Sequence, residues 1–81
     1  MQVRVRLGSG LAALARAPVM ALELDEGATV ADAYDRLAAD QPEIAPALAG
    51  TLAVISGAHA ERERPLRSGE ELALLMPVSG G

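Results

Sequence analysis

The residues best placed for chemistry are the last five of the chain: Pro77, Val78, Ser79, Gly80 and Gly81. Glycines have no Cβ atom, so a Gly-Gly end is thin and can adopt backbone angles that are closed to other residues. Such a tail can enter a narrow tunnel in another protein and present the Gly81 carboxylate to an active site. Pro77 fixes one dihedral angle where the tail begins. The alternative is a frayed end without function, because chain termini are usually disordered.

Three other polar segments are weaker candidates. Asp25 and Glu26 are paired acids, but they precede Gly27 and have no histidine nearby, so a solvated turn is the simpler interpretation. Residues 8–10, Gly-Ser-Gly, could form an anion-binding nest, but no phosphate-loop fingerprint completes it, and a turn is favoured. His59 is the single histidine and has no ligand partner beside it, so we expect it in an exposed loop and predict no metal site.

The composition indicates one small acidic domain. The 81 residues carry a net charge of −4, which argues against nucleic acid as a partner because a nucleic-acid-binding surface is basic. There is no cysteine for a disulfide or a thiolate metal site. All seven basic residues are arginine, which a bias in the composition of the source genome would explain. No apolar stretch approaches the length of a transmembrane helix. We therefore expect a cytoplasmic protein that does not associate with membranes.

Four stretches have the patterns of β-strands. Residues 2–7 alternate polar and apolar side chains, which predicts a half-buried strand. Residues 19–24 place Met20, Leu22 and Leu24 on one face. Residues 52–55 are apolar without alternation, and we expect them to be buried on both faces of a sheet. Residues 72–76 form the last predicted strand, and a short edge strand is expected within residues 58–64.

The clearest predicted helix begins after Thr29. Thr29 and Asp32 have the spacing of a capping box, in which each side chain bonds an otherwise unpaired backbone N–H. Apolar residues follow at helical spacing and form one stripe, namely Val30, Ala33, Tyr34, Leu37 and Ala38. Pro42 is expected to stop the helix near Gln41. Tyr34, the only aromatic residue, is predicted in the core with its hydroxyl reaching the edge. Shorter helical turns are predicted within residues 11–16 and 43–49.

This order of elements predicts an α+β fold. The first two strands form an antiparallel hairpin, and a right-handed crossover through the helix places the last strand parallel to the first. One main helix then packs on one face of a mixed sheet, which is the β-grasp (ubiquitin-like) arrangement. We assign it to residues 1–76, with a flexible tail at residues 77–81. The last strand also presents Ala73 and Leu75 on the face without a helix, and exposed apolar residues there suggest a partner surface.

Several segments together resemble a known family over the whole chain. They are residues 3–7, 27–32, 52–54 and 65–72, and the ending Met-Pro-Val-Ser-Gly-Gly at residues 76–81. In these segments the chain resembles the ubiquitin-like sulfur carriers, and most closely the small subunit of molybdopterin synthase.

The resemblance implies a mechanism and a set of partners. An adenylating enzyme of the ubiquitin-activating type, with ATP and Mg²⁺ bound to that enzyme, would adenylate the Gly81 carboxylate, and a sulfur donor would convert it to a thiocarboxylate. The large subunit of molybdopterin synthase would then enclose the tail and pass the sulfur to a pterin precursor. Gly81 would be the reacting residue, Pro77, Val78, Ser79 and Gly80 the tail-binding residues, and Leu75 a partner contact. The chain alone would bind no cofactor and would not be catalytic.

Two alternatives remain open at the level of the sequence. The chain could carry sulfur for another product, such as thiazole, or act as a ubiquitin-like modifier. Thiazole carriers are usually shorter and lack the segment at residues 43–49, which favours molybdopterin. The other alternative is a β-grasp binding module with an inert tail.

Overall fold

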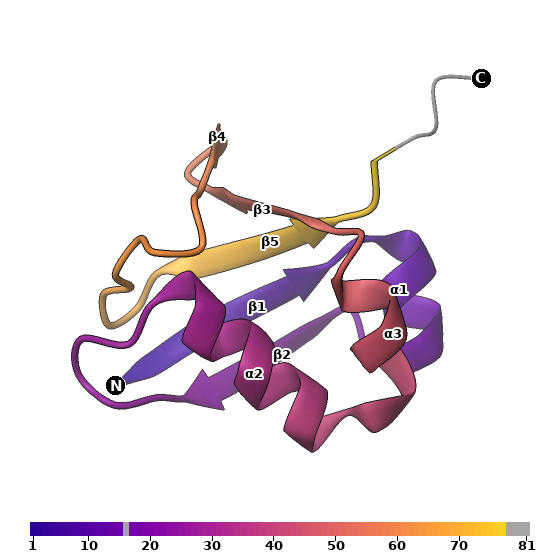
Figure 1. Cartoon of the computed structure of the whole chain (residues 1–81), viewed down its shortest axis with the longest axis horizontal. Coiled ribbons are helices and arrows are strands. Elements are labelled where there is room, and N and C mark those ends of the chain that lie inside the picture. The colour runs from indigo at the N-terminus through magenta and orange to yellow at the C-terminus, as the bar shows by residue number, and fades with distance from the viewer. Residues whose placement is uncertain (16, 78–81) are drawn as a thin grey trace.

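The computed structural model describes residues 1–15 and 17–77 and contains a five-stranded sheet with helix α2 lying across one face (Figure 1). The elements follow one another as β1 (Gln2–Leu7), α1 (Ser9–Ala15), β2 (Val19–Glu23), α2 (Val30–Asp40), a 3₁₀ turn (Pro42–Ile44), α3 (Ala45–Leu48), β3 (Leu52–Ile55), β4 (Ala58–His59) and β5 (Glu71–Leu75). The strand order in the sheet is β2-β1-β5-β3-β4.

The strand pairing confirms the predicted topology. β1 pairs antiparallel with β2, with Val5 opposite Met20, and parallel with β5, with Val5 opposite Leu72. β3 pairs antiparallel with both β5 and β4. β5 therefore lies inside the sheet with a hydrogen-bonded neighbour on each side, and the short strand predicted within residues 58–64 is β4.

The core lies between the sheet and its helices. Alternate residues of β1 and β5 point into it, because successive side chains of a strand face opposite sides. Fully buried side chains come from both layers, namely Val3, Val5, Leu72 and Leu74 from the strands and Leu11, Val30, Leu37 and Ile44 from the helical segments. The predicted stripe of α2 is thus the layer that closes this face of the sheet.

The start of α2 has the predicted capping box. The backbone N–H of Asp32 donates to Thr29 Oγ1 at 3.3 Å, and the backbone N–H of Thr29 donates to Asp32 Oδ2 at 2.8 Å. The helix ends at Asp40, and Gln41 adopts φ −131° before Pro42, as the restriction on a residue preceding proline requires.

Four predictions about local structure were wrong: the burial of β3, the turn at residues 8–10, the position of the Tyr34 hydroxyl, and the loop expected at His59, which is exposed but lies in strand β4. Leu52 in β3 is 45% exposed, so this strand is not buried on both faces. Its second face is the side of the sheet that no helix covers in the described part of the chain. The turn expected at residues 8–10 is also shorter than predicted, because α1 already begins at Ser9.

Tyr34 is buried, as expected, but its hydroxyl does not reach the edge. It lies 2.8 Å from Thr51 Oγ1, which itself donates to the carbonyl of Leu48 at 2.7 Å. Because the single hydroxyl hydrogen of Thr51 is used on Leu48, Tyr34 donates to Thr51. This buried chain of hydrogen bonds ties α2 to the segment that leads into β3.

Candidate functional site

The predicted tail leaves the domain at the end of β5. Leu75 is the last residue of that strand, and it is followed by Met76 and Pro77, both exposed. Val78, Ser79, Gly80 and Gly81 lie outside the described residues, so their predicted roles stay predictions. The structure therefore defines where the tail starts, at the end of an interior strand of the sheet.

The turn between β1 and α1 supports this end of β5. The backbone N–H of Gly8 donates to the carbonyl of Leu74 at 2.9 Å. A Cβ atom on Gly8 would lie 3.3 Å from that carbonyl oxygen and 3.7 Å from Leu75 Cδ2, so a larger residue would press on β5. A Cβ atom on Gly10 would lie 3.5 Å from Met76 Sδ, which is an ordinary van der Waals contact. Gly8 thus has a packing role beside the base of the tail.

An ion pair fixes the opposite end of β5. The guanidinium of Arg64 donates to both carboxylate oxygens of Glu70, at 3.0 and 2.9 Å, and the backbone N–H of Arg67 donates to Glu70 Oε1 at 2.7 Å. The hydrogen bond from Arg64 lowers the pKa of the Glu70 carboxyl. The Glu70 carbonyl accepts from the backbone N–H of Arg4 at 3.0 Å, so the ion pair positions the strand directly against β1.

Four apolar side chains lie together on the uncovered face of the sheet, next to the base of the tail. In the register of β3 and β5, Leu52 is opposite Leu75 and Val54 is opposite Ala73. Leu52 and Leu75 are 45% and 42% exposed. We call these four residues the open-face patch. Opposed pairs of this kind on one face of a sheet are in side-chain contact range, so the patch is one continuous apolar surface.

Charged residues border the open-face patch on the β1 side. Arg6 lies opposite Ala73 in the register of β1 and β5, and its Nε is 3.1 Å from Glu71 Oε1. Both side chains of this ion pair are exposed. An apolar centre with a polar, solvated rim is the usual arrangement of a protein–protein interface. The patch therefore has the composition of a protein–protein contact surface.

The sequence predicted only part of this surface. Leu75 was expected to contact a partner, and the structure places it on the open face. Leu52 and Val54 were missed, because their apolar run suggested burial on both sides. Leu52 and Val54 could have been assigned to this surface from the antiparallel register of β3 and β5, which brings Leu52 opposite Leu75.

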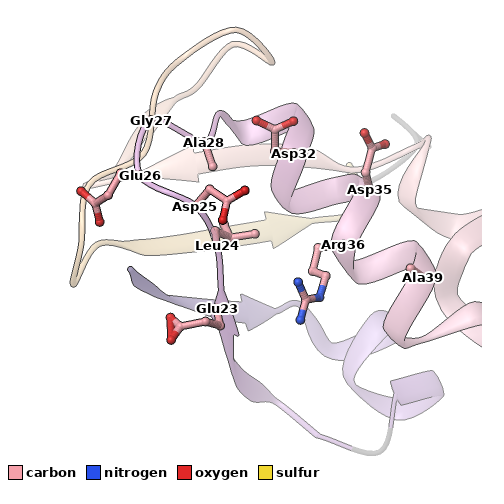
Figure 2. Close-up of a pocket in the computed structure, with 10 residues that line it drawn as sticks. All are labelled: Glu23, Leu24, Asp25, Glu26, Gly27, Ala28, Asp32, Asp35, Arg36 and Ala39. Carbon is pink, nitrogen blue, oxygen red and sulfur yellow. The ribbon is translucent and has the colours of Figure 1, made fainter.

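A concave surface lies at the end of the sheet away from the base of the tail. Its position follows from the strand pairing. Glu23, which lines this surface, pairs with Gln2 at the start of β1, whereas Leu74, near the tail, pairs with Leu7 at the end of β1. This surface is a groove between the end of β2, the following loop and α2 (Figure 2). Its volume is about 520 Å³. The residues that line it are Glu23, Leu24, Asp25, Glu26, Gly27, Ala28, Asp32, Asp35, Arg36 and Ala39. Asp32 caps α2, and Arg36 pairs with Asp40 at 3.1 Å, so some of the charged side chains that line the groove have a structural role.

The remaining sequence candidates are not brought together. Asp25 and Glu26 line the groove described above. His59 lies in β4 opposite Val54, and its Nδ1 is 3.9 Å from Glu61 Oε1. Within residues 1–15 and 17–77, no group of three or more metal-binding side chains occurs. In the same residues, no helix has the length and apolar character needed to cross a membrane.

Solved structures with the same fold include two kinds of ubiquitin-like protein. SAMP1, small archaeal modifier protein 1, from Haloferax volcanii is 28% identical, with all of both chains covered and a TM-score of 0.91. The putative molybdopterin converting factor subunit 1 from Pyrococcus furiosus is 20% identical over 96% of this chain and 99% of that chain, with a TM-score of 0.87.

A third similar structure is a complex of subunits 1 and 2 of the molybdopterin-converting factor from Helicobacter pylori. The matching chain is 17% identical, with all of both chains covered and a TM-score of 0.73. At identities of 20% and 17%, the two molybdopterin-related likenesses bear on the fold alone. No match was found among curated protein sequences.

The sequence itself matches a family model. The model of the ThiS family aligns with residues 11–81, which include all but the first two residues of α1, the whole segment from β2 to β5 and the tail. This match agrees with the β-grasp fold, the exposed end of β5 and the resemblance to the ubiquitin-like sulfur carriers. The chain belongs to the ThiS family.

Proposed function

We propose that this chain is a sulfur carrier for molybdopterin synthesis, in which the carboxylate of Gly81 is adenylated and then converted to a thiocarboxylate. The observation that carries the proposal is the family match, because it extends through residue 81 and so includes the tail. The exposed base of the tail beside the open-face patch supports it, since a partner can contact the domain and receive the tail together.

The chemistry explains why a partner must act first. A carboxylate is a poor electrophile, because its leaving group would be an oxide. On the activating enzyme, a carboxylate oxygen would bond to the α-phosphorus of ATP as the bond to pyrophosphate breaks and pyrophosphate leaves. The product is an acyl adenylate, whose leaving group in the next step is AMP. A sulfur nucleophile from the donor then forms the C–S bond at Gly81 as the C–O bond to AMP breaks.

This chain contributes position rather than catalytic groups. Pro77 restricts the backbone at the exit from β5, and the glycines that follow leave room for a close-fitting channel. Contact of the open-face patch with the partner would hold the domain while the tail is enclosed. Holding the reacting atom in place in this way replaces a bimolecular encounter with a positioned one.

The proposed acceptor of the sulfur is the large subunit of molybdopterin synthase with its pterin substrate. The partner is chosen by analogy with the structure from Helicobacter pylori, which has the same fold and is described as a complex of subunits 1 and 2 of the molybdopterin-converting factor. The patch residues Leu52 and Leu75 are the proposed contact on this chain.

Mass spectrometry tests the carrier function directly. The purified chain is incubated with an adenylating enzyme of the ubiquitin-activating type, ATP and a sulfur donor. We expect a mass gain that equals the replacement of one oxygen by one sulfur, located at Gly81 by fragmentation. An unchanged mass, under conditions that modify a known carrier, would favour a binding module with an inert tail.

A second candidate function is protein modification. It is favoured by the 28% identity and TM-score of 0.91 with SAMP1 from Haloferax volcanii, which is named a modifier protein. In that case the activated Gly81 would form an amide with a lysine of a target protein. The two functions are separated by supplying the charged chain with either the large synthase subunit and pterin precursor or a lysine-bearing acceptor protein. Formation of the dithiolene supports the carrier, and amide-linked products support the modifier.

A further inference from the structure

One edge of the sheet is formed by β2, which pairs with β1 alone among the described residues (Figure 1). The backbone N–H of Leu7 donates to the carbonyl of Pro18, and that of Leu24 donates to the carbonyl of Met1, both at 2.8 Å. Alternate residues of an antiparallel strand bond to the same neighbour. The even-numbered residues of β2 are therefore the ones that bond to β1.

The backbone groups of Val19, Ala21 and Glu23 consequently point away from β1, and all three residues are exposed. In the part of the chain that the structure describes, these groups have no backbone hydrogen-bond partner. Such an edge is a template for a further strand, and proteins usually blunt it with a very short strand, a proline or a lysine. The opposite edge is blunted, because β4 has only two residues. β2 has five residues and contains neither proline nor lysine.

We propose that the edge of β2 binds an extended segment of another protein as an additional antiparallel strand, and that a lysine or arginine of this segment enters the groove beside α2. Addition of a strand to an open sheet edge is a common way of binding a peptide. This binding goes beyond the proposed function and needs no activation of Gly81. Because β1 separates β2 from β5 in the sheet, the bound segment would leave the open-face patch accessible.

The groove shown in Figure 2 determines the charge of the partner. Its lining contains five carboxylates and one guanidinium, which is itself paired with a carboxylate of α2 at 3.1 Å. The two glutamates lie 3.6 and 3.7 Å from the amino group of Met1, and Asp32 caps α2. Asp25 and Asp35 are exposed and form no salt bridge with the residues that the structure describes. A cationic side chain of a bound segment can pair with these two carboxylates.

A second copy of this chain does not fit the site. Each copy carries a net charge of −4, so two copies repel each other. β2 itself, with the sequence Val-Met-Ala-Leu-Glu, has no basic residue that could enter the groove of another copy. The expected occupant is therefore a segment of a different protein.

The register of β2 defines the pattern of that segment. Side chains opposite Met20, Leu22 and Leu24 would face the helices, because those residues lie on the core side of the sheet. Met20 is partly buried against the core and suits an aliphatic neighbour, whereas Leu24 lines the groove and suits a basic one. An antiparallel segment meets Leu24 first. The predicted pattern is a basic residue followed four positions later by an aliphatic residue.

The test uses a capped peptide of this pattern, Thr-Arg-Thr-Val-Thr-Val-Thr, which is titrated into the ¹⁵N-labelled chain and followed by NMR. We expect saturable shifts of the amides of Val19, Ala21 and Glu23 and no shifts at Leu52 and Leu75. Methylation of the backbone nitrogens of the last three threonines removes the donors that would face β2, and should raise the Kd at least about tenfold. Absence of saturable binding, shifts centred on the open-face patch, or equal binding of the methylated peptide would overturn the proposal.

The charge preference is tested with variants of the groove. Asp25→Asn and Asp35→Asn should each raise the Kd of the peptide about two- to fivefold, as expected for an exposed ion pair. The matched control is Glu61→Gln, an exposed acid beside β4 at the other edge of the sheet, which should leave the Kd unchanged. Equal effects of the three variants would overturn the choice of a basic partner. Sedimentation of the chain alone should show a monomer, and a dimer that the peptide dissociates would overturn the proposal in favour of a second copy. None of these measurements depends on the formation of a thiocarboxylate.

Discussion

Truncation of the two leucines that face each other across β3 and β5 tests whether the open-face patch is the docking surface. Leu52 and Leu75 leave 45% and 42% of their surfaces exposed, so this is the part that a partner can cover. Full burial of a leucine side chain contributes about 1.5–3 kcal/mol. Covering the exposed fractions would therefore contribute about 0.7–1.4 kcal/mol for Leu52 and about 0.6–1.3 kcal/mol for Leu75.

The variant Leu52→Ala/Leu75→Ala should then bind the large synthase subunit with a Kd raised about 10- to 80-fold, and each single variant with a Kd raised about 3- to 10-fold. Isothermal titration calorimetry measures both values. Because the two side chains are opposed, the single effects need not add, and the full double-mutant cycle reports their coupling.

The matched control is Leu14→Ala. Leu14 is a leucine of similar exposure, 51%, but it lies on α1 outside the patch, so its truncation should leave the Kd unchanged within about twofold. A domain of this length has a stability of about 4–12 kcal/mol, and thermal unfolding verifies that each variant is folded. Wild-type binding by the folded double variant, together with weaker binding by Leu14→Ala, would refute the assignment of the docking surface.

Three further predictions follow from the tail, the Arg64–Glu70 pair and the cap of α2. Deletion of Gly81 should abolish sulfur transfer and leave the circular dichroism and melting temperature unchanged; molybdopterin synthesis supported by the truncated chain would refute the mechanism. The pKa of Glu70 is lowered in the folded state, so its contribution to stability is full above the ordinary value of 4.5 and is lost as the pH falls through the lowered value. Urea unfolding of Glu70→Gln should therefore show a smaller loss of stability between about pH 5 and about pH 3 than the wild type, and parallel pH profiles would contradict this reasoning. Thr29→Ala should lower the free energy of unfolding by about 1 kcal/mol through loss of the cap, whereas Thr29→Ser should retain most of it; equal losses in the two variants would rule out the hydroxyl as the cause.

Local signals in the sequence were sufficient for the main helix and the topology. The Thr29–Asp32 box and the apolar stripe that follows involve residues within one or two turns of each other, so α2 could be predicted from spacing alone. The parallel pairing of β1 with β5 followed from the handedness of the crossover.

The surfaces of β3 and β5 could not be predicted in the same way. An apolar run such as residues 52–55 does not reveal whether a second layer covers its other face, and Leu52 proved to be exposed. The Arg64–Glu70 pair was also missed, because it joins two residues of an irregular segment that has no periodicity. The tail was identified from composition at the end of the chain, and its last four residues lie outside the described structure.

The place of β5 between two neighbours has a mechanical consequence. A pull on the residues after Leu75 is directed along this strand, which is bonded to β1 on one side and to β3 on the other. The load falls on both ladders at once and in shear, so many hydrogen bonds must break together rather than one after another. An enzyme that binds this end and pulls on it would therefore displace the whole domain before the domain unfolds.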